Sequence, residues 1–146
     1  MVDEFKHNQM FSNDFRLSQR IRLIVGLSII FIIAFIHIFR IGSYLKGNLY
    51  FLYYSYVSDL IIPFGFYFLL CINQLYIKIL QKWYVKAAII IGLTTLAETL
   101  QYFGINALGI TFDPFDILAY VVGVGIAVIF DRTVFRKFIP NWDLGN

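Results

Sequence analysis

Four long apolar stretches, separated by shorter polar segments, dominate the pattern of hydrophobic positions along the chain. They cover residues 21–39, 57–77, 85–103 and 114–130. A helix of about 20 residues rises about 30 Å, the thickness of the hydrocarbon core of a bilayer. We therefore predict an all-α integral membrane protein, an antiparallel bundle of four transmembrane helices. The polar ends at 1–20 and 131–146 are expected to be cytoplasmic tails.

Composition supports a membrane protein. Hydrophobic residues make up 60% of the 146 residues and charged residues 14%, whereas about 25% of a soluble domain is charged. The net charge is +3, but lysine and arginine lie between the apolar stretches, where they set topology and contact anionic lipids. This distribution argues against nucleic acid as a partner and favours membrane lipids.

The positions of the basic residues predict the orientation. Of the twelve lysines and arginines, only Arg40 and Lys46 lie in connections expected to be external. Because basic residues accumulate on the cytoplasmic side, we expect a multi-pass protein of the cell membrane with both termini in the cytoplasm.

Three acidic residues stand out within the predicted helices. Glu98 lies inside the third apolar stretch, and Asp59 and Asp116 lie at the outer starts of the second and fourth. An acid at the centre of a membrane helix costs about 2.5–3.5 kcal/mol on insertion scales, so such residues are commonly functional. All three are expected at one level in the outer half of the membrane.

Helical spacing extends this group of acids into a predicted pocket. Thr94, Glu98 and Gln101 share one helix face, and Asp116 shares a face with Tyr120. Since polar residues turn away from lipid, we expect these faces to converge on an outward-facing acidic pocket. The candidate ligand-binding residues are Glu98, Gln101, Asp59, Asp116, Tyr120 and Tyr67. No catalytic residue, metal site or cofactor motif is identified.

Structural roles remain open for each acid. Asp59 and Asp116 lie in first helical turns, where a negative charge complements the helix dipole. Glu98 has no capping position, and its alternative is a protonated acid hydrogen-bonded within the bundle. Ala119, Gly123 and Ala127 form a narrow stripe that lets another helix approach closely, and a membrane partner is a further possibility there.

The spacing of the acids resembles that of the VanZ-like family of small bacterial membrane proteins, over residues 57–130. The matching positions are Asp59, Phe64 and Tyr67, then Glu98 and Gln101, then Asp116 and Gly123. Basic residues common in that family are replaced, as at Leu60 and Pro63. The resemblance implies a role in the bacterial cell envelope, connected with antibiotic resistance, namely resistance to the glycopeptide teicoplanin. It does not imply a particular chemical reaction.

The sequence favours a non-enzymatic ligand-binding protein and leaves two other classes of function open. The first expectation is a protein that binds a small amphiphile, a lipid-linked headgroup or a glycopeptide-like molecule in the acidic pocket. The alternatives are a proton- or cation-coupled transporter, for which only Asn73, Gln74 and Thr94 offer a path inward, and a structural subunit of an envelope complex.

Overall fold

The computed structural model describes residues 2–104 and 114–142, and these are helical with no strand among them. Three helices carry most of the first hundred residues: α1 (Val2–Ile38), α3 (Ser58–Asn73) and α4 (Trp83–Tyr102). The fourth long helix is α5 (Pro114–Ile129). The short elements are the 3₁₀ turns η1 (Ile41–Tyr44) and η3 (Lys78–Gln81), the helices α2 (Asn48–Leu52) and α6 (Arg136–Phe138), and the π turns η2 (Tyr53–Val57) and η4 (Phe130–Phe135).

Helical structure extends beyond several of the predicted apolar stretches, whereas α3 ends at Asn73, before the predicted end at residue 77. The polar segment 2–20 continues into α1 as one helix of 37 residues, about 55 Å long. Helical structure also covers 48–57, expected as part of an external connection, and 131–138, expected as tail. No glycine or proline interrupts these segments. Extending a helix is far easier than nucleating one. The helical structure therefore continues through these three segments.

Four helical segments have the length and hydropathy needed to cross a membrane. They are Asp14–Ile38, Asn48–Asn73, Trp83–Tyr102 and Phe115–Phe138. The number of predicted spans therefore agrees with the structure.

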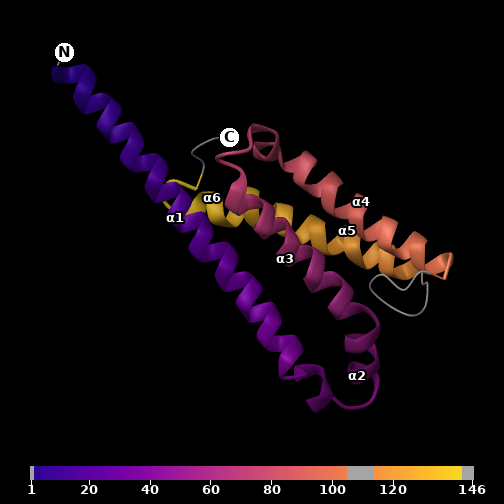
Figure 1. Ribbon diagram of the computed structural model, residues 1–146. Coiled ribbons are helices and arrows are strands. Elements are labelled where there is room, and N and C mark those ends of the chain that lie inside the picture. Colours follow the sequence, from indigo (N-terminus) through magenta and orange to yellow (C-terminus); the bar gives the residue numbers. More distant parts are fainter. Residues whose placement is uncertain (1, 105–113, 143–146) are drawn as a thin grey trace.

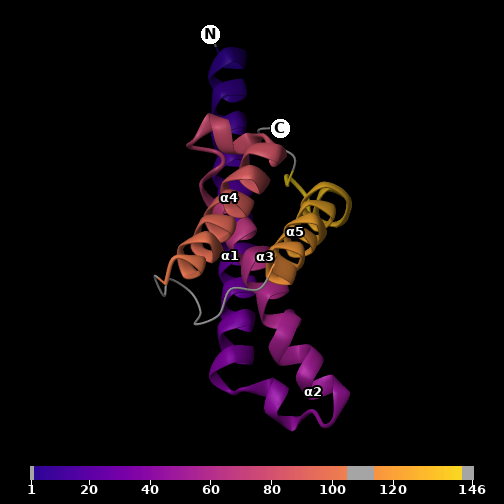
Figure 2. The same ribbon diagram turned by 90° about the vertical axis from the view of Figure 1, so that its right-hand side faces the viewer.

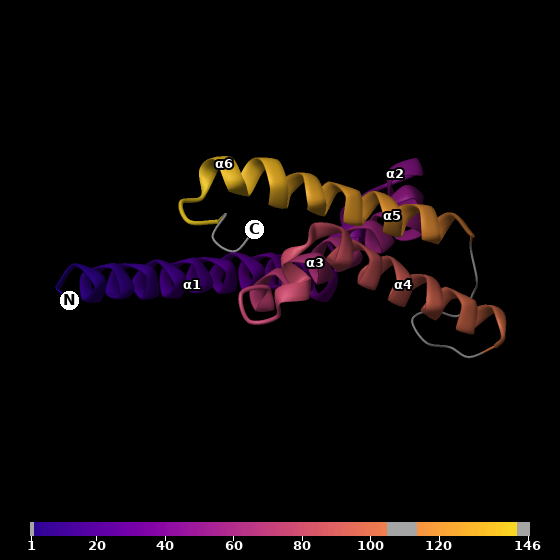
Figure 3. The ribbon, with the colours of Figure 1, turned by 90° about the horizontal axis from the view of Figure 1, so that it is seen from above.

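The spans do not form a symmetrical bundle, because α3 packs against all the others. α1 lies along one side of α3, while α4 and α5 lie on the other, as Figures 1 and 2 show. The view from above separates α1 from α4 and α5 along most of its length (Figure 3). Only 11% of the apolar window of α1 is buried within the chain, so most of this part of the helix is exposed.

The largest interface joins α3 to α5, which run in the same direction. A Cβ atom on Gly123 would lie 2.1 Å from the backbone oxygen of Leu60, so glycine is required for this close approach. Ala127, one turn further along α5, is fully buried. Gly123 and Ala127 of the predicted small-residue stripe therefore pack on α3 within the chain, and a membrane partner at that stripe stays a prediction.

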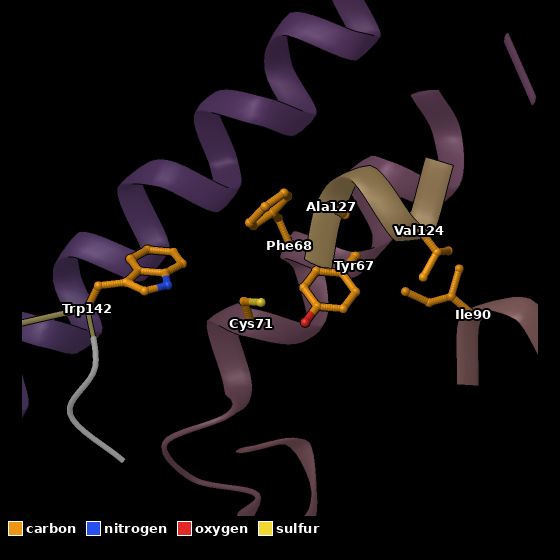
Figure 4. Close-up of a cluster of buried hydrophobic side chains, with 7 residues drawn as sticks. All are labelled: Tyr67, Phe68, Cys71, Ile90, Val124, Ala127 and Trp142. Atoms are coloured by element: carbon orange, nitrogen blue, oxygen red, sulfur yellow. The ribbon is translucent and has the colours of Figure 1, made fainter. Parts of the chain in front are cut away.

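An apolar core fills the space where α3, α4 and α5 meet. Figure 4 shows its buried side chains, which are Tyr67, Phe68, Cys71, Ile90, Val124, Ala127 and Trp142. Aromatic rings pack edge-to-face here, with the centroids of Tyr67 and Phe68 5.6 Å apart. This core occupies the middle of the bundle and holds the polar residues at either end in place.

The contact between α3 and α5 generates the first prediction. Gly123→Ala places a methyl group against the Leu60 carbonyl and should lower the free energy of unfolding by about 1–3 kcal/mol. Gly125→Ala is the matched control, because nothing lies within 4 Å of a Cβ there. Denaturation in mixed micelles measures both. Equal stability of the two variants would contradict the close approach.

Candidate functional site

Glu98 lies in the interior at one end of the bundle, near the end of α4. Its residue is 2% exposed, and Oε1 accepts a hydrogen bond of 2.6 Å from the hydroxyl of Tyr120 on α5. Oε2 is buried and has no hydrogen-bond partner among the described residues. A buried carboxyl oxygen without a donor costs free energy, so this atom has an unmet requirement.

The other predicted acids lie near Glu98. The carboxylates of Asp59, Glu98 and Asp116 all interact electrostatically with the Tyr120 hydroxyl. Gln101 is buried on the same face of α4. We call Glu98, Tyr120, Asp59 and Asp116 the acidic cluster. The structure thus joins Glu98 to Tyr120 directly and brings Asp59 and Asp116 within electrostatic range of the same hydroxyl, while a shared pocket and a role in binding a ligand stay predictions.

Tyr67 lies elsewhere. Its hydroxyl donates a hydrogen bond of 2.7 Å to Oδ2 of Asp131, close to the far ends of α3 and α5. Because Tyr67 is two turns beyond Asp59 along α3, it reaches the opposite end of the core. Of the six candidate ligand residues, Tyr67 is the one that belongs to a different group of polar side chains.

That second group centres on an ion pair between Lys86 and Asp131. The Lys86 ammonium donates to Asp131 Oδ2 at 3.1 Å, to Gln74 Oε1 at 2.6 Å and to Cys71 Sγ at 3.2 Å. It also lies 4.9 Å from the centre of the Tyr67 ring. Lys86 and Asp131 are 1% and 4% exposed, so both charges are buried and paired.

Trp142 and Arg22 extend this group to the C-terminal segment and α1. The Trp142 indole donates to Asp131 Oδ1 at 2.8 Å, and the Arg22 guanidinium donates to the Trp142 carbonyl. Arg22 also stacks on the Trp142 ring, 4.7 Å from its centre. We call these residues, with Lys86, Tyr67, Gln74 and Cys71, the Lys86–Asp131 network. It connects all four long helices.

The sequence interpretation misses this network because its charges lie at the edges of apolar stretches. There, Lys86 and Arg22 are interpreted as topology signals and Asp131 as part of a tail. Spacing holds the overlooked signal: Lys86 lies two and three turns before Thr94 and Glu98 on the same buried face. Asp131 likewise lies four residues after Ala127, in η4, which continues α5, and both residues are buried.

An apolar layer separates the two polar groups. Glu98 and Lys86 are twelve residues apart on α4, about 18 Å along the helix axis. Ile90 and Val124 fill the space between them and are 3% and 1% exposed. The Thr94 hydroxyl donates to its own helix, at the carbonyls of Ile90 and Ile91. The polar residues considered for an inward path therefore do not form a chain: Gln74 binds Lys86 and Asn73 is exposed.

A groove of about 220 Å³ opens between α3 and α4, beside the acidic cluster. Its walls are Phe66, Leu69 and Leu70 of α3 and Ile89, Ile90, Leu93 and Thr94 of α4. Thr94 is the polar residue among them and lies one turn from Glu98.

No cluster of three or more metal-ligating side chains occurs in the described ranges. His37 makes two hydrogen bonds, with Nδ1 donating to the Ile33 carbonyl at 2.8 Å and Nε2 2.9 Å from the Ser58 hydroxyl. It thereby joins the end of α1 to the start of α3.

Comparisons with protein-family models, curated proteins and solved structures found no match. The fold itself defines the class: an all-helical chain with four helices long and apolar enough to span a membrane.

The buried ion pair generates a second prediction. Lys86→Met should lower the free energy of unfolding by about 3–5 kcal/mol, because it leaves the Asp131 charge buried without its cation. The double variant Lys86→Met with Asp131→Asn should lose less than the sum of the single changes. Lys78→Met, an exposed lysine of η3, serves as control and should change stability by less than about 0.5 kcal/mol. Additive losses would contradict the pairing.

Proposed function

We propose that this protein is a non-enzymatic membrane protein that binds a ligand with a cationic or hydrogen-bond-donating group at Glu98. The observation that carries the proposal is Oε2 of Glu98, a buried carboxyl oxygen without a partner. Its other oxygen is already held by Tyr120, which fixes the orientation of the carboxyl group. A ligand donor would complete the set of hydrogen bonds that the chain leaves incomplete.

The surrounding charge supports a cationic ligand. Asp59 and Asp116 act electrostatically on the same tyrosine hydroxyl that donates to Glu98, so acids of two further helices contribute to the potential at Tyr120. In a medium of low dielectric constant, a cation placed there gains more than it would in water. A hydrogen bond involving a charged group contributes about 1.5–3 kcal/mol.

The apolar layer favours binding over transport. A transported proton or cation needs polar groups or water across the membrane, whereas Ile90 and Val124 close the core between Glu98 and Lys86. The acidic cluster therefore functions as a site open to one side only. The role in the cell envelope and in antibiotic resistance stays a prediction from the resemblance, because no family match supports it.

The proposed orientation places the acidic cluster in the outer half of the cell membrane and both termini in the cytoplasm. Two of the basic residues that predict this orientation, Arg22 and Lys86, are buried in the network. Eight remain at the proposed cytoplasmic side against Arg40 and Lys46 outside. The excess of basic residues therefore persists after the buried ones are set aside.

Cysteine labelling tests the orientation as the third prediction. Lys46→Cys should react with a membrane-impermeant maleimide in intact cells, and Lys78→Cys should react only after the cells are permeabilised. Both positions are exposed, while the native Cys71 is 1% exposed and should give little background. The reverse pattern would overturn the orientation.

Binding of a cationic probe tests the function as the fourth prediction. Purified protein in lipid nanodiscs is titrated with dodecylammonium and analysed by native mass spectrometry. Glu98→Gln should weaken binding by about 10- to 100-fold, because it removes the charge from one hydrogen bond. The glutamine oxygen still accepts from Tyr120, so thermal stability should be retained.

Two controls accompany this titration. Asp14→Asn removes an acid in the N-terminal half of α1, away from Glu98, and should leave binding unchanged. Dodecyl sulfate has the same chain with an anionic headgroup and should not bind at this site. Equal binding of dodecylammonium by wild type and Glu98→Gln would refute the proposal.

A further inference from the structure

The groove between α3 and α4 continues the binding site into the membrane. Its wall includes Thr94, which lies one helical turn from Glu98 on α4. From Glu98 to Ile89, at the far end of the groove, α4 runs for nine residues, about 14 Å along the axis. The groove therefore comes within one helical turn of Glu98, at Thr94.

The chemistry of the two parts is different. Apolar side chains form the groove, and the hydroxyl of Thr94 is occupied by its own helix. Nothing in the groove requires a polar ligand, whereas Glu98 requires a donor. A single molecule that satisfies both parts has a polar, donating end and an apolar chain.

We infer that the ligand is a single-chain amphiphile with a protonated amine headgroup, its amine at Glu98 and its hydrocarbon chain in the α3–α4 groove. This inference rests on the proposed function and adds the class of ligand. Charge complementarity selects an ammonium, because the buried Oε2 of Glu98 lacks a donor among the described residues and a carboxylate would repel a phosphate. The groove selects the chain, since it lies alongside the part of α4 that carries the apolar core.

A photoreactive probe tests the inference. The probe is a twelve-carbon alkylammonium with a diazirine at the far end of its chain, added to the protein in lipid nanodiscs. After irradiation, mass spectrometry of peptides should place the adducts on the segments 66–70 and 89–94. Leu93→Trp fills the groove and should reduce these adducts about tenfold, the effect of losing two buried methylene groups.

Leu96→Trp is the matched control. Leu96 lies on the same helix and is 55% exposed, but it does not line the groove. Its tryptophan should leave the adducts unchanged. An uncharged probe, with an alcohol in place of the ammonium, should label the groove no more than other lipid-facing surfaces.

The outcomes separate the two proposals. Labelling that is lost in both Glu98→Gln and Leu93→Trp supports both. Labelling that depends on Glu98 but falls outside the groove, or survives Leu93→Trp, overturns the groove and leaves the proposed function standing. Groove labelling unchanged in Glu98→Gln overturns both. A dimeric mass together with loss of labelling assigns the groove to a second copy of the chain and also overturns the inference.

Discussion

The antiparallel register of α4 and α5 is the constraint on which both polar groups depend. Tyr120 contacts Glu98, and twelve residues back along α4 and eleven forward along α5 the helices meet again at Lys86 and Asp131. A slip of one residue would turn each side chain by about 100° and separate both pairs. Apolar packing tolerates several arrangements, but a buried charge that loses its partner is strongly destabilising. The polar contacts therefore select one register.

The parallel pair α3 and α5 imposes a second register on the same helices. Leu60 lies against Gly123. Seven residues after Leu60, Tyr67 donates a hydrogen bond to Asp131, which lies eight residues after Gly123. A π turn accompanies each end of this pair: η2 ends just before Ser58 and Asp59, and η4 contains Asp131. Such turns add a residue to the helical path and are frequent at functional sites. Here η2 lies next to Asp59, and η4 contains Asp131.

Sequence patterns predict the spans and the acidic residues within them, because a membrane requires long apolar helices and makes a charge inside them costly. A long apolar stretch identifies a span, and an acid such as Glu98 within it cannot be explained as a flanking charge. Lys86 and Asp131 escape the same reasoning, since basic and acidic residues at the edge of a stretch normally face water. The partner of α1 also escapes it. The apolar residues of α1 surround the helix, so no single face predicts that it packs on α3 alone. Gly26 of α1 and Gly65 of α3 allow this packing, because a Cβ atom there would clash with Ile72 and Ile33.

The two polar groups differ in how fully the chain satisfies its buried charges, and this difference separates structure from function. Asp131 receives donors on both oxygens, and Lys86 donates to three acceptors. A pair with all its partners inside the protein stabilises one arrangement and needs nothing else. Glu98 has one donor, and its other carboxyl oxygen has none among the described residues. The network at the other end also leaves the Gln74 amide nitrogen without a partner, but both carboxylate oxygens of Asp131 are bonded. The proposed ligand donor would complete the hydrogen bonding of Glu98 as Lys86, Tyr67 and Trp142 complete that of Asp131.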